Sequence, residues 1–234
     1  KDVYCEKPCA CTIEESQKLR AAFQRSGRIY QAGTQQRSEY NGYFRRASEY
    51  VRSGRIGTLT EVYAYRDGGA IFWPKRFGPG QPVPDDLDWD LFLGPAPEFP
   101  YDGNTGAHRF DIGELNWGQH HYDFIQWATG TDETGPVELF VADGCTNYRY
   151  ASGVVVYGRA YPGESIGGEG GAVFVGSEGR IAVDRNALVS HPARIAREPL
   201  HPGEVHLYRS ESHSGIFLDC VRTRKRPTCD AGIA

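Results

Sequence analysis

The 234-residue sequence contains no methionine, and several signature motifs of common enzyme classes are missing. Lys1 is not a translation start, so we expect residues upstream of it. The GxGxxG pattern that joins a strand to a helix in dinucleotide-binding domains is absent, as are the phosphate loop GxxxxGK[ST], the zinc-protease motif HExxH and the nucleophile motif GxSxG. These absences argue against P-loop kinases, zinc proteases and serine hydrolases.

Long apolar runs and blocks of one charge are also missing. No stretch approaches the roughly 20 apolar residues that cross a bilayer, and no signal peptide is visible, so we expect no membrane partner and a cytoplasmic location. Export to the periplasm stays open because the start of translation is not shown. The net charge of −4 is spread along the chain, with 26 basic and 30 acidic residues. Nucleic acids bind concentrated basic surfaces, so we expect no nucleic-acid partner.

The six cysteines form no pair of CxxC motifs. Cys9 and Cys11 make a single CxC, which is a weak metal signal without a second pair of ligands. Buried or partly buried thiols in a reducing compartment are the simpler interpretation. The sequence therefore predicts no metal site.

Hydrophobic patterning at the start of the chain predicts one α/β unit. Residues 2–5 read as the end of a strand, and residues 12–25 read as a helix. Thr12 and Glu15 form a capping box at the start of that helix, and Gly27 follows its end. Residues 29–32 form a second short strand. A strand, a helix and a strand with tight connections are typical of a parallel sheet covered by helices.

The remainder of the chain predicts a different kind of domain. Helical spacing occurs in residues 43–52, 115–128 and 212–223. Strand patterns occur in residues 59–66 and from 137 to 184, where turn residues between short apolar runs indicate hairpins. The fold class is therefore an α/β remnant of a Rossmann-type domain followed by an α+β domain with a large, mostly antiparallel, open-faced sheet.

An open-faced sheet leaves one apolar surface without helices. Exposed apolar surfaces of this kind mark interfaces, and most soluble assemblies are built from identical copies. We therefore expect a homo-oligomer that associates through the open face of the sheet.

Five segments, which follow one another along the chain as they do in the family, resemble the Gfo/Idh/MocA oxidoreductases. Residues 3–8 (VYCEKP) resemble the EKP motif that closes the cofactor domain, and residues 116–123 (NWGQHHYD) resemble the D-x-G-x-H-x-x-D segment of the second domain. Residues 33–37 (GTQQR), 54–57 (GRIG) and 87–95 (LDWDLFLGP) resemble further family segments. EKP alone is a weak motif, but EKP, then GxQxR, then GxHxxD at these separations is a strong signal. With the hairpin at residues 176–179 and the helix at residues 217–220, the resemblance covers essentially the whole chain.

The resemblance implies a fold, a cofactor and a substrate class. Residues 1–36 would be the C-terminal remnant of a dinucleotide-binding domain, and residues 37–234 a domain for substrate binding and oligomerisation. The cofactor would be NAD or NADP, and the substrate a sugar or polyol. Most of the Rossmann domain would be missing from the sequence, so the fragment alone is expected to be inactive and to bind the dinucleotide weakly.

Two residues match the family's catalytic positions. Lys7 matches the catalytic lysine, whose ammonium would hydrogen-bond the reacting oxygen, with a pKa lowered by burial. His120 matches the catalytic histidine, the proton acceptor. Glu6 and Pro8 flank the lysine at the cofactor edge, and in many relatives the peptide before this proline is cis. Without the motif, Lys7 would read as a surface lysine and His120 as a buried structural histidine.

Asn116 is the departure from the family pattern, which has Asp at this position. It lies four residues before His120 and on the same helix face, so the resemblance makes it a catalytic and substrate-binding candidate. An amide hydrogen-bonds substrate but cannot accept a proton as a base. His121 points about 100° away from His120 around the helix and cannot replace it. Asp123 shares the face of His120 and would orient a neighbour or complete a local network.

Three further positions are candidates for binding. Gln35 and Arg37 match family positions that line the cleft near the cofactor, and both also read as ordinary polar groups at a strand end. Trp73 lies in the irregular segment of residues 67–112, where aromatic rings would stack on a sugar. We assign it to substrate binding.

Three functions remain open on this basis. The first is an NAD(P)-dependent oxidoreductase that transfers a hydride between the nicotinamide and a hydroxyl-bearing carbon of a sugar or polyol in carbohydrate metabolism. The second is an NAD-dependent glycosidase or lyase that oxidises the sugar transiently, which Asn116 would suit. The third is a truncated or inactive module for binding or oligomerisation.

Overall fold

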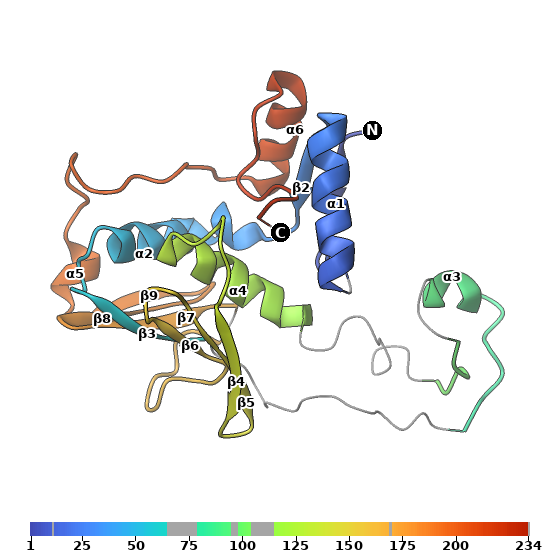
Figure 1. Ribbon diagram of the computed structural model, residues 1–234, viewed down its shortest axis with the longest axis horizontal. Coiled ribbons are helices and arrows are strands. Elements are labelled where there is room, and N and C mark those ends of the chain that lie inside the picture. The colour runs from blue at the N-terminus through green and yellow to red at the C-terminus, as the bar shows by residue number, and fades with distance from the viewer. Residues whose placement is uncertain (11, 65–78, 95–97, 104–114, 169, 234) are drawn as a thin grey trace.

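The structure is a computed structural model. It describes residues 1–10, 12–64, 79–94, 98–103, 115–168 and 170–233, without the side chains of residues 115–117. Two sheets organise the described chain (Figure 1). A small sheet lies beside α1 and α6, and a large sheet is covered on one face by α2 and α4.

The helices are α1 (Ile13–Ser26), α2 (Tyr43–Arg52), α3 (Trp89–Leu93), α4 (Leu115–Thr129), α5 (Arg194–Arg197) and α6 (His213–Thr223), with short 3-10 turns η1 (Gln35–Arg37) and η2 (Tyr40–Gly42). The strands are β1 (Val3–Cys5), β2 (Tyr30–Ala32), β3 (Leu59–Tyr63), β4 (Glu138–Ala142), β5 (Cys145–Arg149), β6 (Val155–Tyr157), β7 (Ala172–Gly176), β8 (Gly179–Val183) and β9 (Leu188–His191). No helix in the described ranges is both long enough and apolar enough to cross a membrane.

The small sheet confirms the strand–helix–strand unit predicted at the start of the chain. Strands β1 and β2 pair in parallel, and α1 connects them. The capping box at the start of α1 is present, with Thr12 and Glu15 each accepting a hydrogen bond from the other's backbone. Gly27 ends the helix at φ 61°, in the left-handed region that glycine adopts without strain.

C-terminal residues complete this unit. The backbone N–H of Ala32 donates to the carbonyl of Cys229 at 2.9 Å. The side chain of Gln31 donates to the carbonyl of His213, at the start of α6, at 2.6 Å. Cys229 is fully buried in the same apolar cluster as Tyr30. The beginning and the end of the chain therefore form one packed unit.

The large sheet has the strand order β4-β5-β6-β3-β7-β8-β9. Its neighbouring strands are antiparallel except β3 and β6, which run parallel. The predicted, mostly antiparallel sheet is thus confirmed. The strand predicted within residues 59–66 is β3, and its register with β7 shifts between Leu59 and Glu61. This irregularity turns Leu59 toward the helix-covered core instead of the opposite face.

Aromatic side chains join the covering helices to the large sheet. Phe44 of α2 meets Phe124 of α4 edge to face, with ring centroids 4.9 Å apart. Phe124 meets Phe174 of β7 in the same way at 5.6 Å. All three are fully buried. This stack fixes how α4 lies on the sheet.

The opposite face of the large sheet carries tyrosines and arginines. Tyr63 and Tyr157 stack with centroids 4.9 Å apart, and the Arg159 guanidinium lies over both rings. Tyr161 and Ile166 pack onto this face from the chain itself. The open face is therefore partly covered by its own chain, and arginine side chains lie over its aromatic rings.

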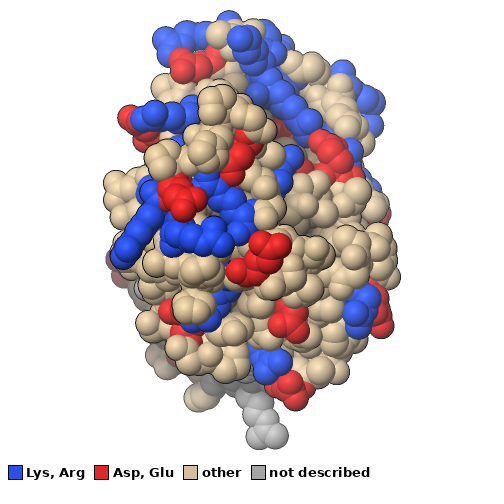
Figure 2. Space-filling model, turned by 90° about the vertical axis from the view of Figure 1, so that its left-hand side faces the viewer, with Lys and Arg blue, Asp and Glu red and all other residues tan. Residues whose placement is uncertain are grey.

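Charges of both signs share the molecular surface. Figure 2 shows one side of the molecule, where basic and acidic side chains lie next to each other over most of the face. Several of them are paired at the surface, for example Arg149 with Glu138 and Arg226 with Asp230.

Candidate active site

Helix α4 carries the predicted histidine. His120 lies one turn before Phe124, whose ring anchors the helix to the sheet, and it is only 5% exposed. The next residue, His121, donates from Nδ1 to the carbonyl of Gly171 in the sheet layer. The two histidines thus point in different directions, as the helical geometry predicts.

Gly171 lies where two backbone segments of the large sheet approach each other closely. A Cβ at residue 171 would lie 1.9 Å from the carbonyl oxygen of Val183. Only glycine fits such an approach of two backbones. Helix α4 is therefore held to β7 and β8 by both ring packing and a histidine hydrogen bond.

Two cations lie close enough to His120 to change its acidity. Burial acts first, and the charges of Arg185 and Lys7 follow, so that the pKa of His120 is lowered to about 3. The imidazole is therefore neutral at physiological pH and able to accept a proton.

Lys7 lies at the carboxyl end of β1, followed by a cis peptide to Pro8. Burial lowers the pKa of Lys7, the Arg185 charge adds to this effect, and the Glu6 carboxylate opposes it. The structure thus brings Lys7 and His120 into one electrostatic cluster. Lys7 follows β1 of the small sheet, and His120 lies on α4, which covers the large sheet.

Glu6 and Gln35 lie together beside Lys7. The side-chain amide of Gln35 donates to the Glu6 carboxylate at 3.2 and 3.4 Å. A Cβ at position 33 would lie 2.4 Å from that carboxylate, so a larger residue there would displace the Glu6 side chain. Glu6 is in this way held at the edge of the small sheet.

Arg37 has a different environment from the cleft position inferred from the resemblance. Its side chain is 1% exposed. Its guanidinium donates to the carboxylates of Asp123 and Asp132 and to the backbone carbonyls of Asp123 and Thr228. These five bonds account for all five N–H donors of an arginine. The predicted place of Arg37 in an open cleft is therefore corrected: a buried guanidinium that is fully hydrogen-bonded inside the protein joins α4 to the C-terminal residues.

Asp123 supports the local network that was expected of it. Besides Arg37, it accepts a hydrogen bond from the thiol of Cys229 at 3.3 Å. It stands three residues after His120 on α4 and anchors the helix to the small unit. Among the described residues, no cluster of three or more His, Cys, Asp or Glu side chains could hold a metal ion.

Two predicted site residues lie where side chains are not described. Asn116 is within α4, one turn before His120, but its side chain lies outside the described part. Trp73 lies outside the described residues altogether. Their assignments remain predictions.

Arg185 and Tyr40 belong to the cluster and were missed in the sequence. The Arg185 guanidinium lies 4.7 Å from the centre of the Tyr40 ring. Arg185 follows the end of β8 and Tyr40 begins η2, so they are 145 positions apart. Nothing in the local sequence of either residue signals the contact, because it depends on how the large sheet packs against the residues that follow the small one.

Comparison with known proteins gives a family for this arrangement. Residues 62–159 match the model described as "Oxidoreductase family, C-terminal alpha/beta domain" of the Gfo/Idh/MocA group. This part of the chain is therefore similar to the C-terminal domain of the Gfo/Idh/MocA-type oxidoreductases. No curated protein matches the sequence.

Solved structures with the same fold include several of these oxidoreductases. The aldose-aldose oxidoreductase from Caulobacter crescentus, complexed with glycerol, has a TM-score of 0.58 and 18% identity. An oxidoreductase domain protein from Kribbella flavida scores 0.54 with 20% identity, and the WlbA dehydrogenase from Bordetella pertussis, in complex with NADH and UDP-GlcNAcA, scores 0.51 with 17%.

All three alignments cover 100% of this chain, but only 66%, 68% and 65% of the respective structures. At these identities the likeness establishes the fold, and the chain accounts for about two thirds of the length of such a protein.

Proposed function

We propose that this chain provides the catalytic side of an NAD(P)-dependent oxidoreductase that acts on a hydroxyl-bearing carbon of a sugar or polyol. The observation that supports it best is the cluster of Lys7 and a neutral, buried His120 at the carboxyl end of β1. Ligands of α/β sheets bind beyond the carboxyl ends of the strands.

The two side chains suit the proton chemistry of alcohol oxidation. When a hydride leaves carbon, the hydroxyl must also lose its proton. His120 is neutral and able to take that proton. The Lys7 ammonium stabilises negative charge on the reacting oxygen. Its lowered pKa also makes the amine easier to deprotonate than an exposed lysine.

The polar side chains around Lys7 suit the nicotinamide end of a dinucleotide cofactor. Lys7, with Glu6 and Gln35 beside it, would border the nicotinamide end of the dinucleotide. The nicotinamide, when bound, accepts or returns the hydride. The solved structure of the WlbA dehydrogenase with NADH and UDP-GlcNAcA, and that of the aldose-aldose oxidoreductase with glycerol, support this choice of cofactor and substrate class.

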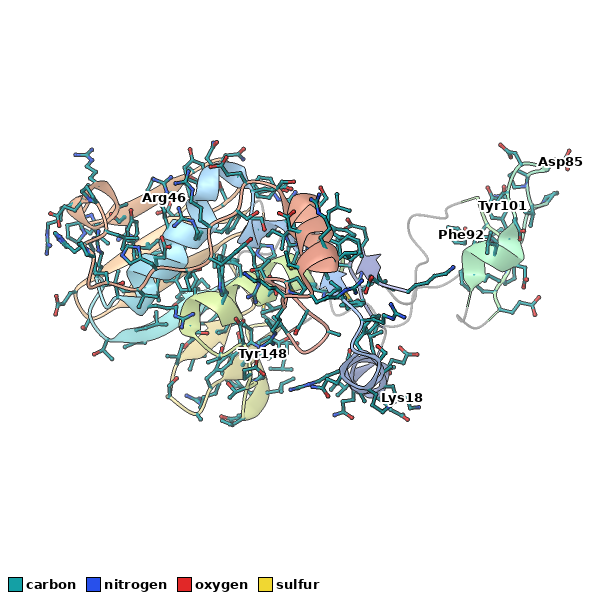
Figure 3. All side chains as sticks on the ribbon, turned by 90° about the horizontal axis from the view of Figure 1, so that it is seen from above. Lys18, Arg46, Asp85, Phe92, Tyr101 and Tyr148 are labelled. Carbon is teal, nitrogen blue, oxygen red and sulfur yellow. The ribbon has the colours of Figure 1, made fainter. Side chains whose placement is uncertain are left out.

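The proposal is tested by Lys7→Met and His120→Asn in the intact protein. Each change is expected to lower the rate of NAD(P)H formation by roughly 10²–10⁴, the usual contribution of a positioned acid or base. Lys18→Met is the matched control, since Lys18 is exposed on α1 and pairs with Glu14 (Figure 3). Equal rates for Lys7→Met and Lys18→Met would contradict the assignment.

The same assay separates the glycosidase or lyase alternative. Release of an aglycone without net NAD(P)H formation would favour it. Failure of the intact protein to bind NAD(P) would favour an inactive module. We expect net NAD(P)H formation, because Lys7 and His120 both match the family's catalytic pattern.

We also propose that the protein self-associates through the open face of the large sheet. On that face the half-buried Val175 and Arg180 lie opposite each other on β7 and β8, beside the stacked tyrosines. Val175→Glu is expected to shift the protein toward the monomer in sedimentation at micromolar concentration. Val141→Glu is the control, because Val141 is 65% exposed on the other face of the sheet. A wild-type monomer would refute the interface.

A further inference from the structure

The segment around α3 is strongly acidic. Residues 79–103, called the acidic arm below, contain six acidic residues and no lysine, arginine or histidine. The whole chain has a net charge of only −4, so the rest of the chain carries an excess of positive charge. The acidic residues of the arm are Asp85, Asp86, Asp88, Asp90, Glu98 and Asp102.

A cluster of aromatic rings holds the described part of the acidic arm together. The Trp89 ring meets Phe99 and Tyr101 edge to face, with ring centroids 5.4 and 5.2 Å apart. The indole N–H of Trp89 donates to the carbonyl of Phe99 at 3.1 Å, and the backbone N–H of Gln81 donates to the carbonyl of Tyr101 at 2.6 Å. The arm is therefore a small folded unit with its own core.

Leu91 of α3 points out of this unit. It is 78% exposed, although leucine side chains are usually buried. Asp90 precedes it in the helix, and Asp88 is the N-cap of α3. Figures 1 and 3 both show α3 apart from the two sheets, with Asp85 on the outer side of the arm. The arm therefore presents an apolar side chain next to carboxylates.

A basic pocket lies at the other end of the molecule. It has a volume of about 450 Å³ and lies between the end of α1, the start of β2 and the residues that follow α6. This volume is in the range of ligand pockets. Its apolar lining includes Phe23, Ile29 and Ala231. Its charged lining consists of Arg20, Arg28, Arg224, Arg226, Glu133 and Asp230.

Arginines outnumber carboxylates in this lining. The Arg226 guanidinium donates to both Asp230 and Glu133, so a single cation satisfies the two acidic residues. Arg28 makes no ion pair with the residues that the structure describes. The basic pocket therefore keeps an excess of positive charge, and the guanidinium of Arg28 is available to a carboxylate from outside.

We propose that the acidic arm of one copy docks into the basic pocket of a second copy of this chain, with Leu91 in the cavity and the carboxylates beside it on the arginines. An apolar anchor within a polar rim is the usual arrangement of protein interfaces. Carboxylates also match the planar fork of a guanidinium. The inference is independent of the chemistry proposed for Lys7 and His120.

The positions of the two surfaces favour a second copy over the arm's own pocket. The basic pocket lies where α1 and α6 end, at the top of Figure 1, whereas α3 lies at the lower right. A contact between two different surfaces is heterologous and joins copies head to tail. It leaves the open face of the large sheet available for the separate contact proposed above.

A photo-cross-link from the arm tests the contact in the intact protein. Leu91 is replaced by the photoreactive amino acid p-benzoylphenylalanine, and protein of normal mass is mixed with isotope-labelled protein before irradiation. We expect cross-links of hybrid mass between residue 91 of one copy and residues 20–30 or 224–232 of the other. Cross-links within one copy, cross-links to another region, or no cross-link at all would overturn the inference.

Charge removal tests the role of the arginines. Arg20→Gln combined with Arg28→Gln is expected to lower the cross-link yield by about 10-fold, as for loss of charge-assisted hydrogen bonds at a partly exposed site. Arg25→Gln is the matched control, because Arg25 is in the last turn of α1 but is not among the residues that line the pocket. Equal yields in these two variants would contradict docking through the arginines.

A mixing experiment separates docking between copies from docking within one copy. Asp86→Asn combined with Asp90→Asn weakens the arm but leaves the basic pocket intact. The photoreactive protein with Arg20→Gln and Arg28→Gln keeps its arm, and it is expected to regain its cross-link yield when this second variant is added. An unchanged low yield would show that the arm does not reach the pocket of another copy, and would refute the proposal.

Discussion

Two charged clusters lie one helical turn apart on α4, and they are built in opposite ways. Around Asp123, one guanidinium meets two carboxylates, and each of its N–H donors has a partner within the protein. Around His120, burial and the charges of Arg185 and Lys7 keep the imidazole neutral. A balanced buried cluster holds elements together, whereas a titratable group with a strongly shifted pKa at strand ends is suited to chemistry.

The largest effect on stability is expected from a substitution of Arg37. Arg37→Met would leave Asp123 and Asp132 without their buried cation, so we expect a loss of about 3–5 kcal/mol in the free energy of unfolding. Urea denaturation would measure it.

Arg226→Met is the control, because Arg226 pairs with Asp230 and Glu133 at the surface. Such pairs contribute at most about 1 kcal/mol. Similar losses for the two variants would show that the Arg37 cluster is not the anchor described above.

The pH dependence of stability tests the second cluster. The pKa of His120 is about 3 in the folded protein, against roughly 6.5 for an unfolded histidine. Between these values the unfolded chain binds more protons, so stability falls as the pH falls. This residue alone is expected to remove about 2 kcal/mol between pH 7 and pH 5.

His120→Gln is expected to flatten this part of the curve, measured as the free energy of unfolding at several pH values. His206→Gln, at an exposed histidine, is the control. An unchanged slope in His120→Gln would contradict the buried, cation-flanked environment.

The smallest effect is expected from Asn116→Asp in the intact protein. A carboxylate at this position would add negative charge one helical turn from His120, near the cations that surround it. We expect activity to survive or to rise by up to about tenfold, as for a modest electrostatic gain. A steep fall in NAD(P)H formation would indicate a site rebuilt around asparagine, and would favour the redox-neutral alternative.

Local features of the fold could be predicted from the sequence, and long-range ones could not. The capping box at Thr12, the glycine at residue 27 and helix α2 follow from neighbouring residues, and each is present in the structure. The parallel pairing of β3 with β6 has no local signal, because the partners are more than 90 residues apart.

The residues of the candidate site also fall into those that the sequence could identify and those that it could not. Lys7 and His120 stand in short motifs and could be named from the sequence. Arg185 has no motif, and its role depends on its contact with Tyr40 across the fold. Arg37 matched a motif position, yet burial and two carboxylates define its environment. A motif indicates which residue type is present, but not which partners the packing supplies.

The positions of the Arg37 partners in the sequence determine when its hydrogen bonds can form during translation. The guanidinium bonds residues 86, 95 and 191 positions later in the sequence. Arg37 therefore leaves the ribosome long before the Thr228 carbonyl exists, and the nascent chain must keep this cation hydrated until then. Contacts of such long range form late, so the bonds of Arg37 to Asp132 and Thr228 would form only after those residues have left the ribosome.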